Sequence, residues 1–146
     1  MTRPAGFENL IKTNALEAVA PTPGAVAGFL SNAEGYRASA KEVDPTRYLQ
    51  IFTMAYEGYF QVVQAILEFY EVRTKDSGRN LAIQLVSSTL GASPVEQALI
   101  AKTHARRNGM SYGSPFPPVS SAEAQAMLDI LEKYLPVARQ LTGTPA

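Results

Sequence analysis

The residues whose types and spacing could carry chemistry lie in one short stretch of the chain. His104, Arg106, Arg107, Asn108 and Tyr112 bring an imidazole, two guanidinium groups, an amide and a phenol together. A guanidinium group binds phosphate through two parallel hydrogen bonds, an amide bonds a base or a ribose, and an imidazole exchanges protons near neutral pH. The stretch therefore indicates recognition of a phosphate-bearing ligand, with or without proton transfer.

If this stretch is helical, His104, Arg107 and Asn108 share one face, because residues three and four positions apart are neighbours on a helix. His104 is then a candidate proton acceptor beside Arg107. A purely structural interpretation stays open, since basic side chains are favoured in the last helical turn and Asn108 before Gly109 is typical of a helix end. Tyr112 could likewise contact a ligand or pack its ring under the proline-rich loop that follows.

The stretch resembles the R-x4-6-H signature of HEPN domains, which are all-helical modules associated with nucleotides and RNA. Arg107 matches the motif arginine, Asn108 matches the polar residue beside it, and Tyr112 stands where the histidine would be. An aromatic-rich segment at 56–67 and a last helix after a polar loop extend the resemblance over about residues 22–142. Ribonuclease members of this family act at a dimer interface and need no metal, so the resemblance implies no cofactor.

The tyrosine at the motif position implies weak or absent catalysis. A Tyr pKa near 10 lies about three units above that of His, so using the phenol as a base costs about 4 kcal/mol. Binding through Arg106, Arg107 and Asn108 survives this change more easily than catalysis by Arg107, Tyr112 and His104. We expect Tyr112→His to restore a group that transfers protons.

Three functions follow from the resemblance. The first is a dimeric RNA- or nucleotide-associated binding module with weak or no catalysis. The second is a metal-independent ribonuclease, such as the toxin of a toxin-antitoxin pair, with His104 or Tyr112 replacing the usual histidine. The third is the helical partner subunit of a small nucleotidyltransferase.

The composition limits the possible chemistry. With 13 basic and 13 acidic residues the formal net charge is zero, so attraction to nucleic acid depends on a local patch. The chain has no Cys and one His, which excludes thiol catalysis and a multi-histidine metal site within one chain. No stretch is apolar enough to predict a membrane span or a signal peptide, and we expect a cytoplasmic protein.

The elements that must position these residues are predicted to be helices, with no strand. Apolar spacing, capping residues and breakers indicate an up-and-down bundle of four to five main helices in one domain of 146 residues. We expect a helical arm within 1–21, a bundle over 22–142 and a tail at 143–146. The expected helices cover residues 6–19, 23–43, 45–73, 81–90, 94–108 and 120–141.

The helix expected at 45–73 carries two apolar stripes. One runs through Phe52, Val63 and Leu67, and the other through Ala55, Val62 and Ile66. A helix that is apolar on two sides is buried on two sides. In a small domain this pattern predicts a homodimer that covers the second stripe.

Overall fold

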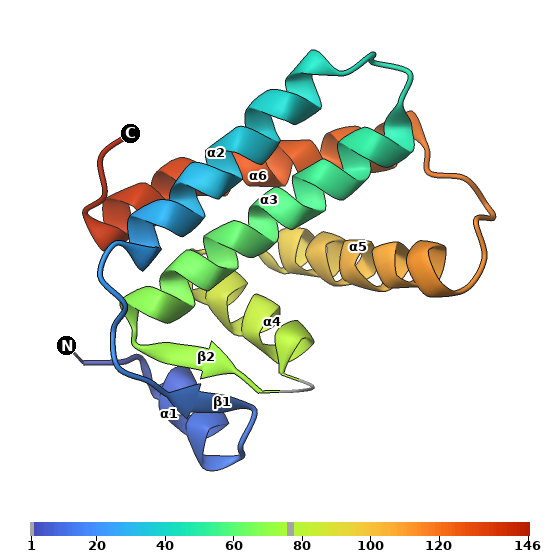
Figure 1. Cartoon of the computed structure of the whole chain (residues 1–146). Coiled ribbons are helices and arrows are strands. Elements are labelled where there is room, and N and C mark those ends of the chain that lie inside the picture. Colours follow the sequence, from blue (N-terminus) through green and yellow to red (C-terminus); the bar gives the residue numbers. More distant parts are fainter. Residues whose placement is uncertain (1, 76–77) are drawn as a thin grey trace.

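The computed structural model describes residues 2–75 and 78–146 as six α-helices and one two-stranded antiparallel sheet (Figure 1). The predicted helical bundle is confirmed, whereas the prediction that the chain has no strand is wrong. In chain order the elements are α1 (Ala5–Lys12), β1 (Leu16–Ala18), α2 (Ala25–Glu42), α3 (Tyr48–Phe69), β2 (Val72–Thr74), α4 (Arg79–Thr89), α5 (Pro94–Tyr112) and α6 (Ser121–Thr142).

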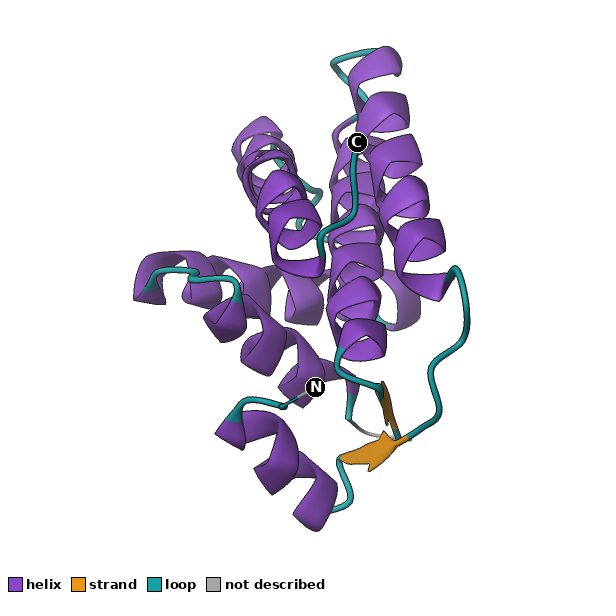
Figure 2. Cartoon of the chain, turned by 90° about the vertical axis from the view of Figure 1, so that its left-hand side faces the viewer, coloured by secondary structure: helices purple, strands orange, loops and turns teal. Residues whose placement is uncertain are grey.

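Helix α3 is the centre of the molecule. It packs along α2 and α6, while α4 and α5 contact it from another side (Figures 1 and 2). Residues of both predicted stripes are buried within this single chain, including Phe52 and Val63 from one and Ala55 and Ile66 from the other. The two apolar stripes therefore give no reason to expect a dimer, because the chain's own helices cover both sides of α3.

The amino-terminal arm folds differently from the prediction of one helix over 6–19. Helix α1 ends at Lys12, and Asn14 adopts a left-handed φ of 63° that turns the chain back. The chain then forms β1, in which Leu16 pairs with Thr74 of β2. Phe7 of α1 is fully buried and its ring centroid lies 4.8 Å from that of Tyr70. The arm is thus part of the packed structure.

Helix α3 is shorter than the predicted 45–73. At its start, Asp44 accepts a hydrogen bond from the N–H of Thr46 and does not cap the helix. At its end, Glu71 has a left-handed φ of 60°, which stops the helix and leads into β2. The Arg3 side chain donates hydrogen bonds to the carbonyl oxygens of Tyr70 and Glu71, at 2.7 and 3.2 Å. The arm therefore holds this turn in place.

The arm also contacts the start of α4. The Ala15 carbonyl accepts a hydrogen bond from the N–H of Lys75, and a Cβ added at Gly78 would lie 2.2 Å from that same oxygen. Only glycine allows so close an approach of two backbones. Gly78 immediately precedes Arg79, so the arm fixes the position at which α4 begins.

The predicted starts of the last two helices are confirmed. Ser93 with Glu96 and Ser120 with Glu123 form the capping boxes of α5 and α6. The carboxylate of Glu96 also accepts hydrogen bonds from the side chains of Lys133 and Tyr134, which joins the start of α5 to α6. Helix α6 continues through its internal proline, which has an exposed side chain.

Two further predicted helix boundaries are wrong. Helix α2 begins at Ala25, after a left-handed Gly24, and not at residue 23. Helix α5 continues past Asn108 and Gly109 to Tyr112, and its last turn contains no basic residue. Since the helix dipole acts mainly within the last turn, the basic residues at 104–107 are not explained by a helix end.

No helix within residues 2–75 and 78–146 combines the length and the apolar character needed to cross a bilayer.

At Gly58 the helices α2, α3 and α6 approach one another closely, which provides a test of this packing. A Cβ at Gly58 would lie 2.7 Å from Leu131 Cδ2 and 2.9 Å from Tyr36 Cβ. We expect Gly58→Ala to lower the free energy of unfolding by about 1–3 kcal/mol, measured by urea denaturation. The matched variant Gly35→Ala on α2 has no atom within 4 Å of the new Cβ, so it should raise stability by about 0.5–1 kcal/mol. Equal effects of the two variants would contradict the α2–α3 packing.

Candidate functional site

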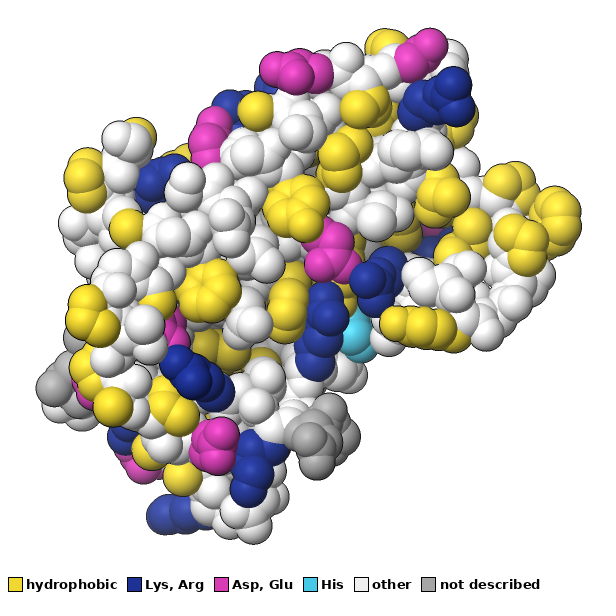
Figure 3. All heavy atoms as spheres, viewed as in Figure 1, with side chains coloured by type: hydrophobic (Ala, Val, Ile, Leu, Met, Phe, Trp, Pro, Cys, Tyr) yellow, Lys and Arg dark blue, Asp and Glu magenta, His cyan; other side chains and the backbone are white. Residues whose placement is uncertain are grey.

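Charged and polar side chains from three helices meet where α4 and α5 pack against α3. Figure 3 shows acidic, basic and histidine side chains gathered together on this face of the molecule. The cluster consists of Tyr56 and Glu57 from α3, Arg79 from α4, and His104, Arg107 and Asn108 from α5. His104, Arg107 and Asn108 thus lie on one face of α5, as the spacing predicts.

Glu57 is shared by two arginines. The Arg107 Nη2 donates a hydrogen bond to Glu57 Oε1 at 2.8 Å, and the Arg79 Nη2 lies 3.8 Å from the same oxygen. All three side chains are partly buried, with exposed fractions of 22% for Arg107, 21% for Glu57 and 35% for Arg79. Two positive charges therefore face one negative charge in a site that is partly shielded from water.

Several N–H groups of this pair have no acceptor. Among the described residues, Arg79 Nε and Nη2 and Arg107 Nε are buried without a hydrogen-bond partner. One face of the Arg79 guanidinium group is covered by the Phe60 ring, whose centroid is 3.6 Å away. Unsatisfied buried donors are costly, so the hydrogen-bonding capacity of the two arginines is incompletely used within the described residues.

His104 lies beside the two arginines in a chain of hydrogen bonds. The Tyr56 hydroxyl is 2.7 Å from His104 Nδ1, and Asn108 Nδ2 is 3.4 Å from His104 Nε2. The Asn108 Oδ1 accepts a hydrogen bond from Arg107 Nη1 at 3.3 Å, which orients the amide. The short contact fixes the imidazole ring, and the long contact leaves Nε2 only weakly engaged.

The charge state of His104 follows from its surroundings. Burial lowers the His104 pKa below its ordinary value, and the nearby positive charges of Arg79 and Arg107 lower it further. Burial raises the pKa of Tyr56, so its phenol stays protonated at neutral pH. The site therefore contains a neutral imidazole beside two guanidinium groups.

The two remaining predicted site residues lie elsewhere. Arg106 donates hydrogen bonds to the carboxylate of Glu123 at 2.9 Å and to the carbonyl of Pro117 at 2.7 Å. It thereby holds the proline-rich loop against α5 and α6. Tyr112 is the last residue of α5 and is 83% exposed, and within the described residues its phenol makes no hydrogen bond.

Tyr56, Glu57 and Arg79 were not predicted as site residues. Arg79 lies before the helix predicted at 81–90, but it is the first residue of α4, joins the cluster and is only partly exposed. A signal for Glu57 was present, because it is the only acidic residue between positions 45 and 67 and interrupts an apolar helix. An isolated charge in an apolar segment indicates a specific partner.

No group of three or more acidic, histidine or cysteine side chains in the described part of the chain is arranged to hold a metal ion.

Comparison with known proteins returns no matching family model and no matching curated protein.

The single histidine allows a direct test of the site's electrostatics. We expect the wild-type His104 pKa, measured by NMR titration of the imidazole, to lie below its ordinary value of 6.5. Arg79→Gln should raise this pKa, because it removes a nearby positive charge. Arg106→Gln is the matched control and should leave it unchanged, since Arg106 faces Glu123.

The same shift predicts a pH dependence of stability. The unfolded chain binds a proton at His104 at a higher pH than the folded chain does. The wild-type protein should therefore lose stability as pH falls from about 6.5 through the folded pKa. The loss contributed by this residue should be smaller in Arg79→Gln, and the opposite order would contradict the described site.

Proposed function

We propose that the chain is a HEPN-like helical protein that binds RNA or a nucleotide through Arg79 and Arg107. The observation that carries this proposal is that two partly buried guanidinium groups share one carboxylate and, among residues 2–75 and 78–146, retain N–H donors without acceptors. A phosphate group supplies both the negative charge and the acceptor oxygens that this arrangement lacks.

The local charge also supports an anionic ligand. The chain as a whole has a formal net charge of zero, yet Arg79, Arg107 and Glu57 together carry one excess positive charge beside a neutral His104. Such an excess in a partly desolvated site attracts anions more strongly than the same charge in water. Asn108 lies next to Arg107 and can bond a base or a ribose.

Weak or absent catalysis is part of the proposal. Tyr112 occupies the motif position of the family's histidine, and its exposed phenol makes no hydrogen bond within the described residues. An ordinary phenol is mostly protonated at neutral pH and is a poor proton acceptor.

A second candidate is metal-independent RNA cleavage with His104 as proton acceptor. It is favoured by the neutral imidazole of His104, which Tyr56 orients next to the Arg107 guanidinium group. A neutral imidazole with a weakly engaged Nε2 can accept a proton from a ribose hydroxyl.

A homodimer with two facing sites remains a proposal that rests on the family resemblance. The ribonuclease members bring two copies of the motif together at a dimer interface. Burial of both α3 stripes within one chain means that no large apolar face of α3 requires such a partner.

The binding proposal makes opposite predictions for the removal of the Arg107 charge and the removal of the Glu57 charge. Arg107→Ala should weaken binding of inorganic phosphate and of a short single-stranded RNA by about 10- to 100-fold, because a hydrogen bond to a charged group contributes about 1.5–3 kcal/mol. Glu57→Gln should strengthen phosphate binding, since it removes a competing acceptor. Isothermal titration calorimetry measures both effects.

Matched control variants distinguish an effect of the site itself from an effect of the protein's net charge. Lys12→Gln and Glu17→Gln change the net charge by the same amounts on the exposed amino-terminal arm. Neither should change phosphate affinity by more than a small factor at 0.15 M salt. Unchanged phosphate affinity in Arg107→Ala would refute the proposed site.

RNA cleavage distinguishes the two candidate functions. The binding proposal predicts no cleavage of single-stranded RNA by the wild-type protein at pH 7 in the presence of EDTA. Cleavage that is abolished by His104→Ala would instead establish the second candidate. Tyr112→His tests the motif position in parallel, and a gain of cleavage there would identify residue 112 as the one that limits catalysis.

A further inference from the structure

We propose that the groove between α2 and α3 holds the base and ribose of a nucleotide whose phosphate lies at the Arg79–Arg107 pair. This inference rests on the proposed function and deepens it by naming the ligand class. The groove's shape, its chemistry and its position next to the arginines all fit such a ligand.

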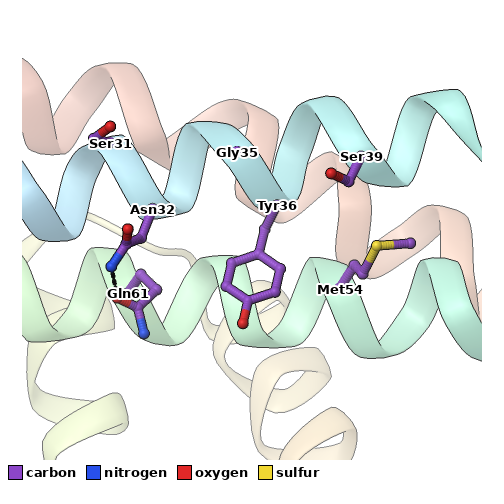
Figure 4. A pocket seen from close by; sticks show the side chains of 7 residues that line it. All are labelled: Ser31, Asn32, Gly35, Tyr36, Ser39, Met54 and Gln61. Carbon is purple, nitrogen blue, oxygen red and sulfur yellow. Dashed lines mark hydrogen bonds between the residues drawn. The ribbon is translucent and has the colours of Figure 1, made fainter.

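The groove is an open depression along the two helices, with a volume of about 500 Å³. Small-molecule sites typically have volumes of about 300–1,000 Å³. Figure 4 shows the ring of Tyr36 pointing from α2 toward α3, with Asn32 and Gln61 on one side of it and Met54 on the other. The lining residues are Ser31, Asn32, Gly35, Tyr36, Ser39, Met54 and Gln61.

The lining suits the uncharged part of a nucleotide. It contains no charged side chain, one tyrosine ring that is 36% exposed, and amides and hydroxyls that both donate and accept hydrogen bonds. The Asn32 Nδ2 donates to Gln61 Oε1 at 3.1 Å, so each amide retains further groups for a ligand. An exposed aromatic ring stacks on any base, and amides bond base edges.

The groove adjoins the arginine pair through α3. Met54 and Gln61 lie three residues before and four residues after Glu57, so all three are neighbours on the helix surface. Gly58, which follows Glu57, allows Tyr36 to approach, because a Cβ there would be 2.9 Å from Tyr36 Cβ. The groove therefore runs past the stretch of α3 that carries Glu57, the residue whose carboxylate Arg107 and Arg79 share.

The arginines, Glu57 and the groove correspond in turn to the phosphate, the ribose and the base of a nucleotide. The guanidinium groups supply the positive charge for phosphate, and Glu57 supplies an acceptor for a ribose hydroxyl. The neutral groove beyond supplies a ring and amides for the base. Inorganic phosphate would use only the first of these three parts, so a nucleotide should bind more tightly than phosphate.

Tyr112 offers a competing location for the base. It follows Asn108 by four residues on α5 and is 83% exposed, so a base could stack there instead. Tyr112 does not line the groove in which the amides of Asn32 and Gln61 lie beside Tyr36. The two tyrosines are therefore a matched pair for the test.

The experiment compares AMP and inorganic phosphate by calorimetry on the full chain. Tyr36→Ala should weaken AMP binding by about 5- to 150-fold, the effect of losing one stacked base, and should leave phosphate affinity unchanged. Tyr112→Ala should change neither. If Tyr112→Ala weakens AMP binding and Tyr36→Ala does not, the base lies on α5 and the inference is wrong.

A second pair of variants tests the groove without removing a side chain, so that a loss of binding is not caused by misfolding of Tyr36→Ala. Gly35 lines the groove and a Cβ there meets no atom within 4 Å, so Gly35→Leu should obstruct the groove while it favours the helix. Gly28→Leu has the same free space on the same helix but lies outside the lining. Only Gly35→Leu should reduce AMP affinity to that of phosphate. If phosphate binding depends on Arg107 but neither Gly35→Leu nor Tyr36→Ala changes AMP affinity, the groove is not the base site and only the further inference is refuted. If the protein does not bind phosphate at all, the proposed function is refuted as well.

Discussion

The interaction on which the candidate site depends is the sharing of Glu57 by two arginines. One carboxylate on α3 pairs with Arg107 of α5 at 2.8 Å and with Arg79 of α4 at 3.8 Å. The same carboxylate therefore helps to fix two helices on the central one. Because it neutralises only one of two charges, it also leaves the site short of negative charge. Charge pairs that are partly buried and incompletely satisfied contribute little to stability and are typical of functional sites.

The charge state of His104 follows from its burial together with that same imbalance. A fully neutralised pair would not repel a proton, whereas the excess charge of Arg79 and Arg107 adds to burial in keeping the imidazole neutral. Tyr56 completes the arrangement, because its buried phenol stays protonated and holds the ring at 2.7 Å. A bound phosphate would reverse part of this effect by bringing negative charge close to the imidazole. Binding of an anion at the arginines would therefore be coupled to the protonation of His104.

Local sequence signals predicted the parts of the fold that depend on neighbours along the chain. The capping boxes at Ser93 and Ser120 were recognisable because every participating group lies within four residues. The end of α3 was not, since Glu71 adopts a left-handed conformation that its residue type does not favour. The site was predictable only along α5, where the spacing of His104, Arg107 and Asn108 defines a face. Arg79 and Glu57 join it through tertiary packing, which short-range spacing does not reveal.

The amino-terminal arm has a consequence for the order in which this chain folds. Arg3 bonds carbonyl oxygens 67 and 68 positions further along, and Ala15 touches Gly78 immediately before Arg79. Contacts of such large sequence separation form late, because a long loop must first be closed. During synthesis the arm emerges before α3 and β2, so its docking surface is absent until they have followed it. Arg79 is therefore among the last residues of the cluster to be positioned.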